Sequence, residues 1–272
     1  SNGNVYTDIT QSLSLGGLTY GVTNMELTSA YASIANGGTY QKPVLYTKVV
    51  DHNGNILLSN TQKGKRVMKE STAFLLTDAM KDVITKGTGK SAKLSSSMAV
   101  AGKSGTTSNS YDYWFSGYTP YHTASVWMGY DKNTNFASDN THKKIWAKVM
   151  NEIIKTKQEQ TTDFKKPADI VKAKVCKESG KLAIKGVCDH DPRGSRVITE
   201  YFEKGTVPTQ TCDIHVAVEV CKTSDKLATK NCPANKKQRK IYIVRKKGSH
   251  GKTADTPYML PKKYQSVFCK KH

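Results

Sequence analysis

One stretch of the sequence combines residue types that can do chemistry on a peptide-like ligand. Residues 100–107 read Val-Ala-Gly-Lys-Ser-Gly-Thr-Thr, and apolar residues leading into small and β-branched ones predict a strand. Side chains alternate along a strand, so we expect Lys103 and Gly105 on one face and Ser104 and Thr106 on the other. A lysine beside a cleft provides a positive field for a carboxylate and can lower the pKa of a neighbouring group. A glycine at this place lets the backbone of a ligand lie against the strand.

The residues that follow strengthen this interpretation. Residues 108–110 supply a polar turn, and residues 114–118 return as a second strand. The tripeptide Lys-Ser-Gly by itself is common, and a strand end with a solvated lysine would explain it. Together with Asp-Tyr-Trp-Phe-Ser-Gly-Tyr-Thr-Pro at residues 112–120, however, it resembles the transpeptidase domain of class A penicillin-binding proteins.

A second stretch carries the same resemblance. Residues 15–38 contain Leu-Gly-Gly-Leu-Thr-Tyr-Gly-Val, then Met-Glu-Leu, Ala-Tyr-Ala and Ala-Asn-Gly-Gly, in an order similar to the segment between the second and third motifs of these transpeptidases. The residues alone predict a core helix in which Thr23 and Glu26 form a capping box and two glycines end the helix. The resemblance covers residues 13–155 well and the remainder more loosely.

The resemblance implies an activity and a role for each motif residue. Lys103 would face the serine of the second motif and assist proton transfer, while the hydroxyls of Ser104 and Thr106 would hold the carboxylate of a peptidoglycan stem peptide or a β-lactam. The backbone N–H of Thr106 would be one oxyanion donor. Gly105 and Thr107 would complete the substrate-binding strand. The implied reaction is acyl-enzyme formation on D-Ala-D-Ala and transfer to the amine of a neighbouring stem, with Lys103 and Thr106 as catalytic residues and no cofactor.

The sequence departs from the family at its nucleophile. The family's Ser-x-x-Lys and Ser-x-Asn motifs both precede the Lys-Thr/Ser-Gly motif. Here the only Ser-x-x-Lys spans residues 249–252, and the Ser-Asp-Asn at residues 138–140 also follows Lys103. We interpret both as coincidental matches. The chain is therefore expected to be the C-terminal piece of a longer enzyme and to be inactive alone, with the missing N-terminal half of the transpeptidase domain as its partner.

The same resemblance implies a location. Family members carry an upstream glycosyltransferase domain and an N-terminal transmembrane helix, neither of which is visible here, and act at the extracellular face of the cell membrane. No apolar run in this sequence approaches the length of a membrane span.

Periodic apolar residues predict the elements around the motif. We expect a hairpin over residues 43–59, a helix capped by Ser71, a third strand over residues 122–130, and a helix with an apolar stripe over residues 145–154. The resemblance implies that these elements form part of a β-lactamase/D,D-transpeptidase-like fold, in which helices cover an antiparallel sheet. The predicted fold class is therefore α/β, more narrowly α+β.

Charge and cysteine content divide the chain in two. The formal net charge is +20, yet residues 1–140 carry 12 basic and 9 acidic side chains, so most of the excess lies in the remainder. All six cysteines also lie there. We expect the transpeptidase part at residues 1–156, a linker at residues 157–170, and a small basic, β-rich, cysteine-containing domain at residues 171–272.

An internal repeat marks the second part. Val-Cys-Lys-Glu-Ser-Gly-Lys-Leu-Ala at residues 175–183 is echoed by Val-Cys-Lys-Thr-Ser-Asp-Lys-Leu-Ala at residues 220–228. If each copy is a hairpin, the expected disulfides are Cys176–Cys188 and Cys221–Cys232, with Cys212 and Cys269 left over. Six cysteines allow fifteen disulfide connectivities, so this pairing is one of many. A set of reduced, buried cysteines is as good an interpretation as disulfide bonds. Zinc ranks below both because the chain has no Cys-x-x-Cys pair, so we expect no metal. Similar basic segments with cysteines follow the transpeptidase in some clostridial-type class A proteins.

The basic tail has several candidate partners. Its densest runs are Lys-Lys-Gln-Arg-Lys at residues 236–240 and Arg-Lys-Lys at residues 245–247. No recognition fold or stacking aromatic motif accompanies them, so we expect no specific nucleic-acid partner. Outside a cell the anionic partners would be wall polymers or lipid head groups. A non-catalytic module that binds anionic wall polymer is therefore the alternative function. A basic surface that only interacts with solvent explains the charge of the tail equally well.

Overall fold

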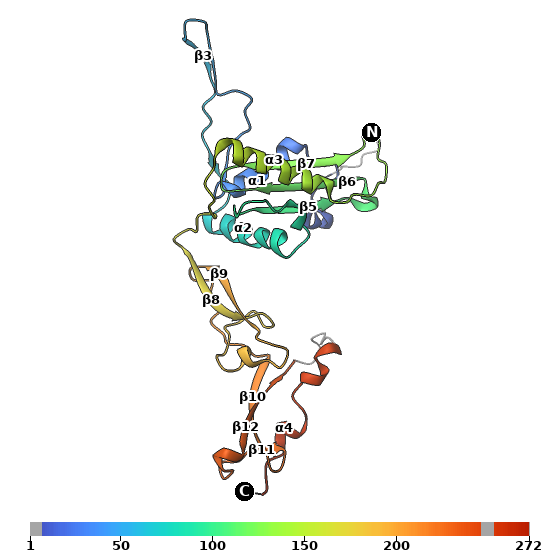
Figure 1. Ribbon diagram of the computed structural model, residues 1–272, viewed down its shortest axis with the longest axis vertical. Helices are drawn as coiled ribbons and strands as arrows, with labels where there is room; N and C mark the ends of the chain where they lie inside the picture. The colour runs from blue at the N-terminus through green and yellow to red at the C-terminus, as the bar shows by residue number, and fades with distance from the viewer. Residues whose placement is uncertain (1–6, 246–252, 272) are drawn as a thin grey trace. The chain divides into compact units, whose positions relative to one another are not determined.

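The structure is a computed structural model that describes residues 7–245 and 253–271. The chain divides into two compact units, Ser1–Ala168 and Asp169–His272, which are described separately below (Figure 1). Within the described part of the chain, no helix has both the length and the apolar character needed to span a bilayer. The Ser-x-x-Lys match at residues 249–252 lies outside the described residues.

The first unit is built on an antiparallel sheet of three strands in the order β5-β6-β7. These strands are β5 (Ala101–Thr106), β6 (Asp112–Tyr118) and β7 (Thr123–Gly129). β5 and β6 form the hairpin that the sequence predicts, joined across Ser108–Ser110, and Lys103 lies opposite Ser116. Both strands and the third one are therefore confirmed as elements.

Three helices cover this sheet. They are α1 (Asn24–Ala35), α2 (Glu70–Thr85) and α3 (Thr141–Lys157). Phe115 and Tyr118 are three residues apart on β6, so their side chains lie on opposite faces of the sheet. Phe115 packs with Trp146 of α3 in one core cluster, whereas Tyr118 packs with Met80 of α2 and with α1 in another. The sheet therefore has a packed core on each face, as expected for an α+β layered fold.

Helix α1 begins as the sequence predicts, and α2 does not. The Thr23 N–H donates to Glu26 Oε2 at 2.8 Å, and the Glu26 N–H donates to Thr23 Oγ1 at 3.2 Å, which is the complete capping box. The prediction that Ser71 caps α2 is wrong. The helix starts at Glu70 with Lys69 in the cap position, and Ser71 is buried inside the first turn.

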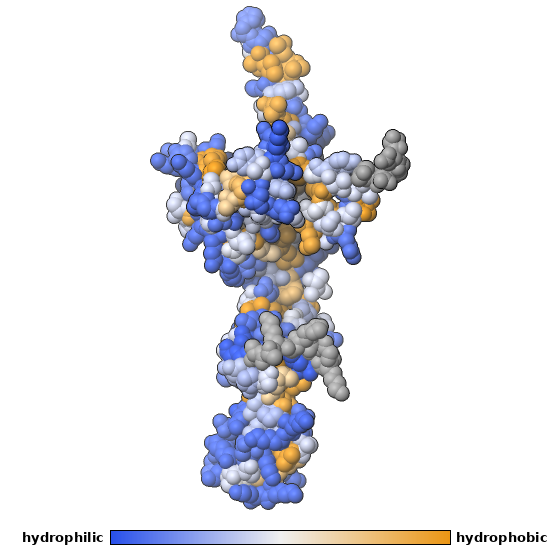
Figure 2. Space-filling model, turned by 90° about the vertical axis from the view of Figure 1, so that its right-hand side faces the viewer, coloured by the Kyte–Doolittle hydropathy of each residue, from blue (hydrophilic) through white to orange (hydrophobic). Residues whose placement is uncertain are grey.

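The predicted hairpin over residues 43–59 is present but shorter. Its strands are β2 (Lys48–Val50) and β3 (Ile56–Ser59), joined by a turn in which Gly54 has a left-handed backbone with φ of +84°. Every residue of both strands is exposed, and their apolar side chains gather at the upper end of Figure 2. This hairpin therefore adds nothing to either core cluster. A further short pair joins β1 (Thr39–Tyr40) to β4 (Lys65–Arg66).

Part of the segment expected as a linker packs on the first unit. The Ala99 N–H donates to the Thr162 carbonyl at 3.1 Å, Lys81 forms an ion pair with Asp163 at 2.8 Å, and Phe164 lies edge-on to Tyr118. α3 also extends to Lys157. The change from the first to the second unit therefore falls at Asp169, immediately before the next strand.

The second unit contains two small antiparallel sheets. β8 (Ile170–Cys176) pairs with β9 (Val197–Glu203), while β10 (His215–Cys221) lies between β11 (Lys226–Leu227) and β12 (Lys237–Ile243). The two sequence repeats turn in the same way, with Gly180 and Asp225 at equivalent positions and φ values of +69° and +49°.

Short helical segments are also present in both units. They are Gln11–Leu15, Lys90–Ala92, Cys188–His190, Ala234–Lys236, Thr253–Tyr258 and α4 (Lys263–Ser266).

The two glycines of the β5 motif differ in the space around them. A Cβ added to Gly102 would lie 2.8 Å from Phe115 Cζ and 2.8 Å from the Ser116 carbonyl oxygen, whereas one on Gly105 would meet only Trp114 Cβ, at 3.5 Å. We therefore expect Gly102→Ala to lower the free energy of unfolding of the first unit by about 1–3 kcal/mol. Gly105→Ala is the matched control and should change it little. Urea denaturation checks both, and an equal loss in the two variants would contradict the packing seen here.

Candidate functional site

The predicted motif lies on β5, at an open edge of the sheet. Among the described strands β5 pairs only with β6. The Thr107 N–H donates to the Asp112 carbonyl at 3.2 Å, and backbone groups along an antiparallel strand alternate in direction. The backbones of Lys103 and Gly105 therefore point toward β6, and those of Ser104 and Thr106 point toward the open edge. This edge can accept an extended peptide as an additional strand.

The side chains of the motif present hydroxyl and ammonium groups beside this edge. Lys103 is exposed, and its ammonium group donates to the Ser104 carbonyl at 2.7 Å. The hydroxyl of Ser104 lies 2.9 Å from that of Thr88, in the loop after α2. Thr106 is exposed as well. These groups can hold a carboxylate through a charge and hydroxyl hydrogen bonds.

Thr107 is engaged in the turn that follows β5. Its hydroxyl donates to Asp112 Oδ2 at 3.0 Å and accepts from the Asp112 N–H at 2.9 Å. The other carboxylate oxygen of Asp112 accepts from Trp127 Nε1 at 2.8 Å. These bonds tie the turn to β7 and so fix the end of the motif strand. The substrate-binding role of Thr107 stays a prediction.

A second lysine, Lys143, lies close enough to Lys103 for their charges to interact, and no sequence motif marks it. Lys143 is buried in the first turn of α3, and its ammonium group donates to Asn140 Oδ1 at 2.7 Å. Burial lowers the pKa of Lys143, and the positive charge of Lys103 lowers it further. Forty residues separate the two lysines in the sequence, and a lysine in a helical first turn usually indicates solvent exposure. The charges of Lys103 and Lys143 therefore interact, although Lys143 itself is buried and bonded to Asn140.

The Ser-Asp-Asn sequence at residues 138–140 forms the start of α3. Asn140 occupies the cap position with a left-handed backbone, φ +69°. Hydrogen bonds from Lys144 and Thr141 lower the pKa of Asp139 to about 2. Ser138 Oγ lies 3.2 Å from His142 Nδ1. All three residues have a local role at the helix terminus.

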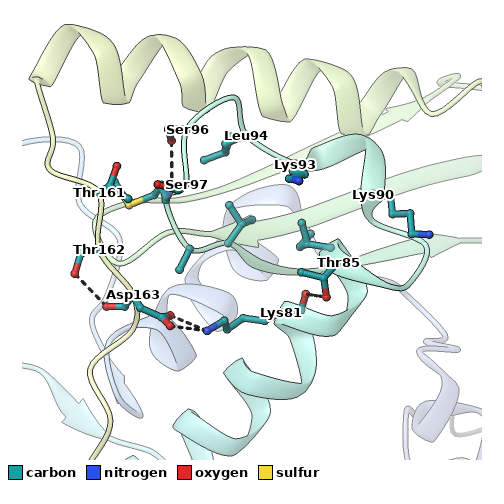
Figure 3. A pocket seen from close by; sticks show the side chains of 14 residues that line it. Lys81, Thr85, Lys90, Lys93, Leu94, Ser96, Ser97, Thr161, Thr162 and Asp163 are labelled. Atoms are coloured by element: carbon teal, nitrogen blue, oxygen red, sulfur yellow. Dashed lines mark hydrogen bonds and ion pairs between the residues drawn. The ribbon is translucent and has the colours of Figure 1, made fainter. Parts of the chain in front are cut away.

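A separate cavity of about 710 Å³ lies between α2, the loop after it and the segment that follows α3 (Figure 3). Lys81 points toward Asp163 on one side of the cavity, and Lys90, Lys93 and Thr161 line other parts of its wall (Figure 3). None of residues 103–107 lines it. The cavity is therefore distinct from the edge of β5.

The cysteines are arranged differently from the predicted pairs. All six are buried free thiols, so neither expected disulfide is present. They gather in two groups of three, one of which includes a histidine. Parallel backbone bridges bring the third cysteine into each group. Thr211, which precedes Cys212, is bridged to Leu182, and Phe268, which precedes Cys269, is bridged to Leu227. Cys212 and Cys269 are the two cysteines that the predicted disulfides left over.

Comparisons with known proteins agree with this arrangement. The family model of the penicillin binding protein transpeptidase domain matches residues 2–155, and that of the penicillin-binding protein 1A C-terminal domain matches residues 166–217. Penicillin-binding protein 1A of Clostridium botulinum (strain Langeland) is 36% identical over 256 residues, and that of Clostridium novyi is 32% identical over 262 residues. These alignments cover 92% and 96% of this chain but only 30% of each relative.

A solved structure shows the fold. The crystal structure of penicillin-binding protein 1A from Haemophilus influenzae superposes with a TM-score of 0.60 at 23% identity, covering 76% of this chain and 35% of that one. The expected α+β transpeptidase-like fold is thus confirmed. With more than half of its residues matched by the family model, the chain belongs to the penicillin-binding protein transpeptidase family.

Proposed function

We propose that this chain supplies the Lys-Ser-Gly-Thr strand of a serine D,D-transpeptidase that cross-links peptidoglycan stem peptides and is acylated by β-lactams. The observation that carries the proposal is the open edge of β5, toward which the backbones of Ser104 and Thr106 point. A stem peptide is extended, so it can pair with this edge as an added strand. The Thr106 N–H then donates to the developing oxyanion.

Charge and space at the edge support this role. The terminal carboxylate of a stem peptide, or the carboxylate of a penicillin, would be attracted by the positive charge of Lys103 and would accept hydrogen bonds from the hydroxyls of Ser104 and Thr106. The Gly105 position is open, so a ligand backbone can approach the strand. Lys103 would relay a proton to or from the serine that faces it. No cofactor takes part in this scheme.

In this proposal the nucleophile and the remaining partners lie outside the 272 residues of this chain. The chain spans about 30% of the length of the curated relatives that it matches. Its only Ser-x-x-Lys lies at residues 249–252, far along the sequence from the motif strand. We propose that the serine is provided by a preceding part of the transpeptidase domain, that the whole acts at the extracellular face of the membrane, and that this chain alone is inactive.

Intact mass spectrometry after incubation with a penicillin tests this proposal. The longer protein should gain one penicilloyl group, and the 272-residue chain should gain none. Peptide mapping would then place the adduct on a serine outside this chain. An unmodified longer protein that still binds isolated wall polymer would favour the non-catalytic module instead. An adduct on the isolated chain, at Ser249 for example, would overturn the assignment of the nucleophile.

A further inference from the structure

Four buried side chains of the second unit converge on one point. We call them the first thiol cluster: Cys176, Cys188, Cys212 and His215. Their ligand atoms, three sulfurs and one imidazole nitrogen, all lie within 4.8 Å of one another. His215 Nδ1 is 3.4 Å from the sulfur of Cys176 and 3.3 Å from that of Cys212. Tetrahedral zinc with Zn–S bonds of 2.3 Å separates its ligand atoms by about 3.8 Å, so the cluster is close to the required size.

A buried carboxylate orients the histidine of this cluster. His215 Nε2 lies 2.6 Å from Asp191 Oδ2, and neither side chain has any exposed surface. The imidazole donates its Nε2 proton to the carboxylate, so the lone pair of Nδ1 faces the two sulfurs. Asp191 is held in turn by Arg193, whose guanidinium donates to both of its oxygens. A metal-bound histidine has the same arrangement, in which a carboxylate sets its tautomer and direction.

Backbone N–H groups donate to the second cysteine of each repeat. The Ile184 N–H donates to Cys188 Sγ at 3.3 Å. In the second repeat, the Thr229 N–H donates to Cys232 Sγ at the same distance of 3.3 Å. Hydrogen bonds to a thiolate stabilise the form that binds a metal. The two repeats therefore hold their second cysteine by the same backbone contact.

The other three cysteines form a second thiol cluster: Cys221, Cys232 and Cys269. Its geometry repeats that of the first. The Cys212 N–H donates to the Leu182 carbonyl at 2.8 Å, and the Cys269 N–H donates to the Leu227 carbonyl at 2.8 Å. The sequence also places His272 three residues after Cys269, the spacing that separates His215 from Cys212. His272 lies outside the described residues.

Disulfide bonding explains this arrangement less well than metal binding. A disulfide joins two sulfurs, so each group of three would keep one unpaired thiol in a buried position. A histidine oriented by a carboxylate has no role beside a disulfide. With four protein ligands and full burial, the first cluster has no open coordination position, which is the property of a structural site rather than a catalytic one.

We propose that the first thiol cluster binds one structural zinc ion and that the second thiol cluster supplies three thiolate ligands to another. The second unit is then a tandem of two zinc-binding modules. Each cysteine binds as the thiolate, so loading the first cluster with Zn²⁺ releases three thiol protons to solvent.

Zinc content and thiol content measured on the same sample test this proposal. The 272-residue chain, purified with reductant and without chelator, should contain about two zinc ions, one for each cluster. Denaturation with chelator but without reductant should then expose six alkylatable thiols. A zinc-free chain, or one with fewer reactive thiols because of disulfides, would overturn the proposal. If the chain contained a single zinc ion, the second thiol cluster would not be a zinc site and that part of the proposal would be wrong.

Two variants and one control locate the ions. Cys212→Ser and Cys269→Ser should each lose one zinc ion while keeping the other. His190→Ala should keep both, because the side chain of His190 is 68% exposed and lies outside the cluster. Unchanged zinc content in Cys212→Ser would contradict the assignment of ligands. X-ray absorption spectroscopy of the unmodified chain identifies the zinc ligands even if a variant does not fold. Zinc bound by oxygen rather than by sulfur would contradict the proposal.

Discussion

Replacing Lys103 with alanine in the longer protein is expected to slow acylation by penicillin ~100- to 10,000-fold, the range for loss of a positioned proton-transfer group. The structure places this lysine on the open edge strand, exposed and beside the backbone of Ser104. Its removal takes away a charge for the carboxylate and a group that can exchange a proton with the nucleophile. The measurement is the rate at which a labelled penicillin becomes covalently attached.

Two further variants define what this lysine contributes. Lys103→Arg keeps the positive charge but cannot give up a proton near neutral pH, so it should not restore the rate. Recovery in the arginine variant would assign Lys103 a purely electrostatic role. Lys93→Ala is the matched control, because Lys93 is exposed and lines the separate cavity of Figure 3. An acylation rate in Lys103→Ala close to that of the control would remove Lys103 from the site.

Replacing Trp146 with alanine should have the largest effect on stability. Trp146 has no exposed surface, lies edge-on to Phe115 at a ring distance of 5.2 Å, and donates from Nε1 to the Ala124 carbonyl at 3.0 Å. Its loss leaves a cavity between α3 and the sheet and removes this hydrogen bond. We expect the free energy of unfolding of the first unit to fall by about 3–5 kcal/mol.

Fluorescence of the two remaining tryptophans, both in the first unit, follows this unfolding in urea. Ile145→Ala is the control. Ile145 neighbours Trp146 on the same helix but is 44% exposed, so its truncation should cost about 0.5 kcal/mol or less. A similar midpoint in Trp146→Ala and Ile145→Ala would mean that α3 does not anchor the sheet.

Local patterns predicted the elements around the motif. The capping box at Thr23, the hairpin over residues 100–118 and the covering helices depend on contacts between residues close in sequence, and such contacts leave a signature in residue type and spacing. Ser71 shows the limit of this reasoning. A serine before an apolar stripe is a good cap, yet here Ser71 is buried against the core, and the helix begins at Glu70, two residues before the start that a Ser71 cap would give.

Long-range proximity was not predictable in this way. Lys143 reaches the neighbourhood of Lys103 only because α3 folds back over the sheet. Cys212 reaches Cys176 through a parallel bridge between Leu182 and Thr211. Parallel pairing joins segments that are distant in sequence, and no turn signal marks it. The sequence repeat indicated two copies of one hairpin, but the third cysteine of each group lies outside the repeated residues.

Strand β10 has a position that affects how the second unit responds to force. It begins at His215, in the first thiol cluster, and ends at Cys221, in the second. Seven residues of strand span about 20 Å, so one continuous backbone segment links the two proposed metal centres. With a zinc ion bound at each end, the strand would not fray from either terminus. Tension applied to the C-terminal end would then have to break a metal–ligand bond before β10 could separate from β12, and the two modules would resist extension as one element.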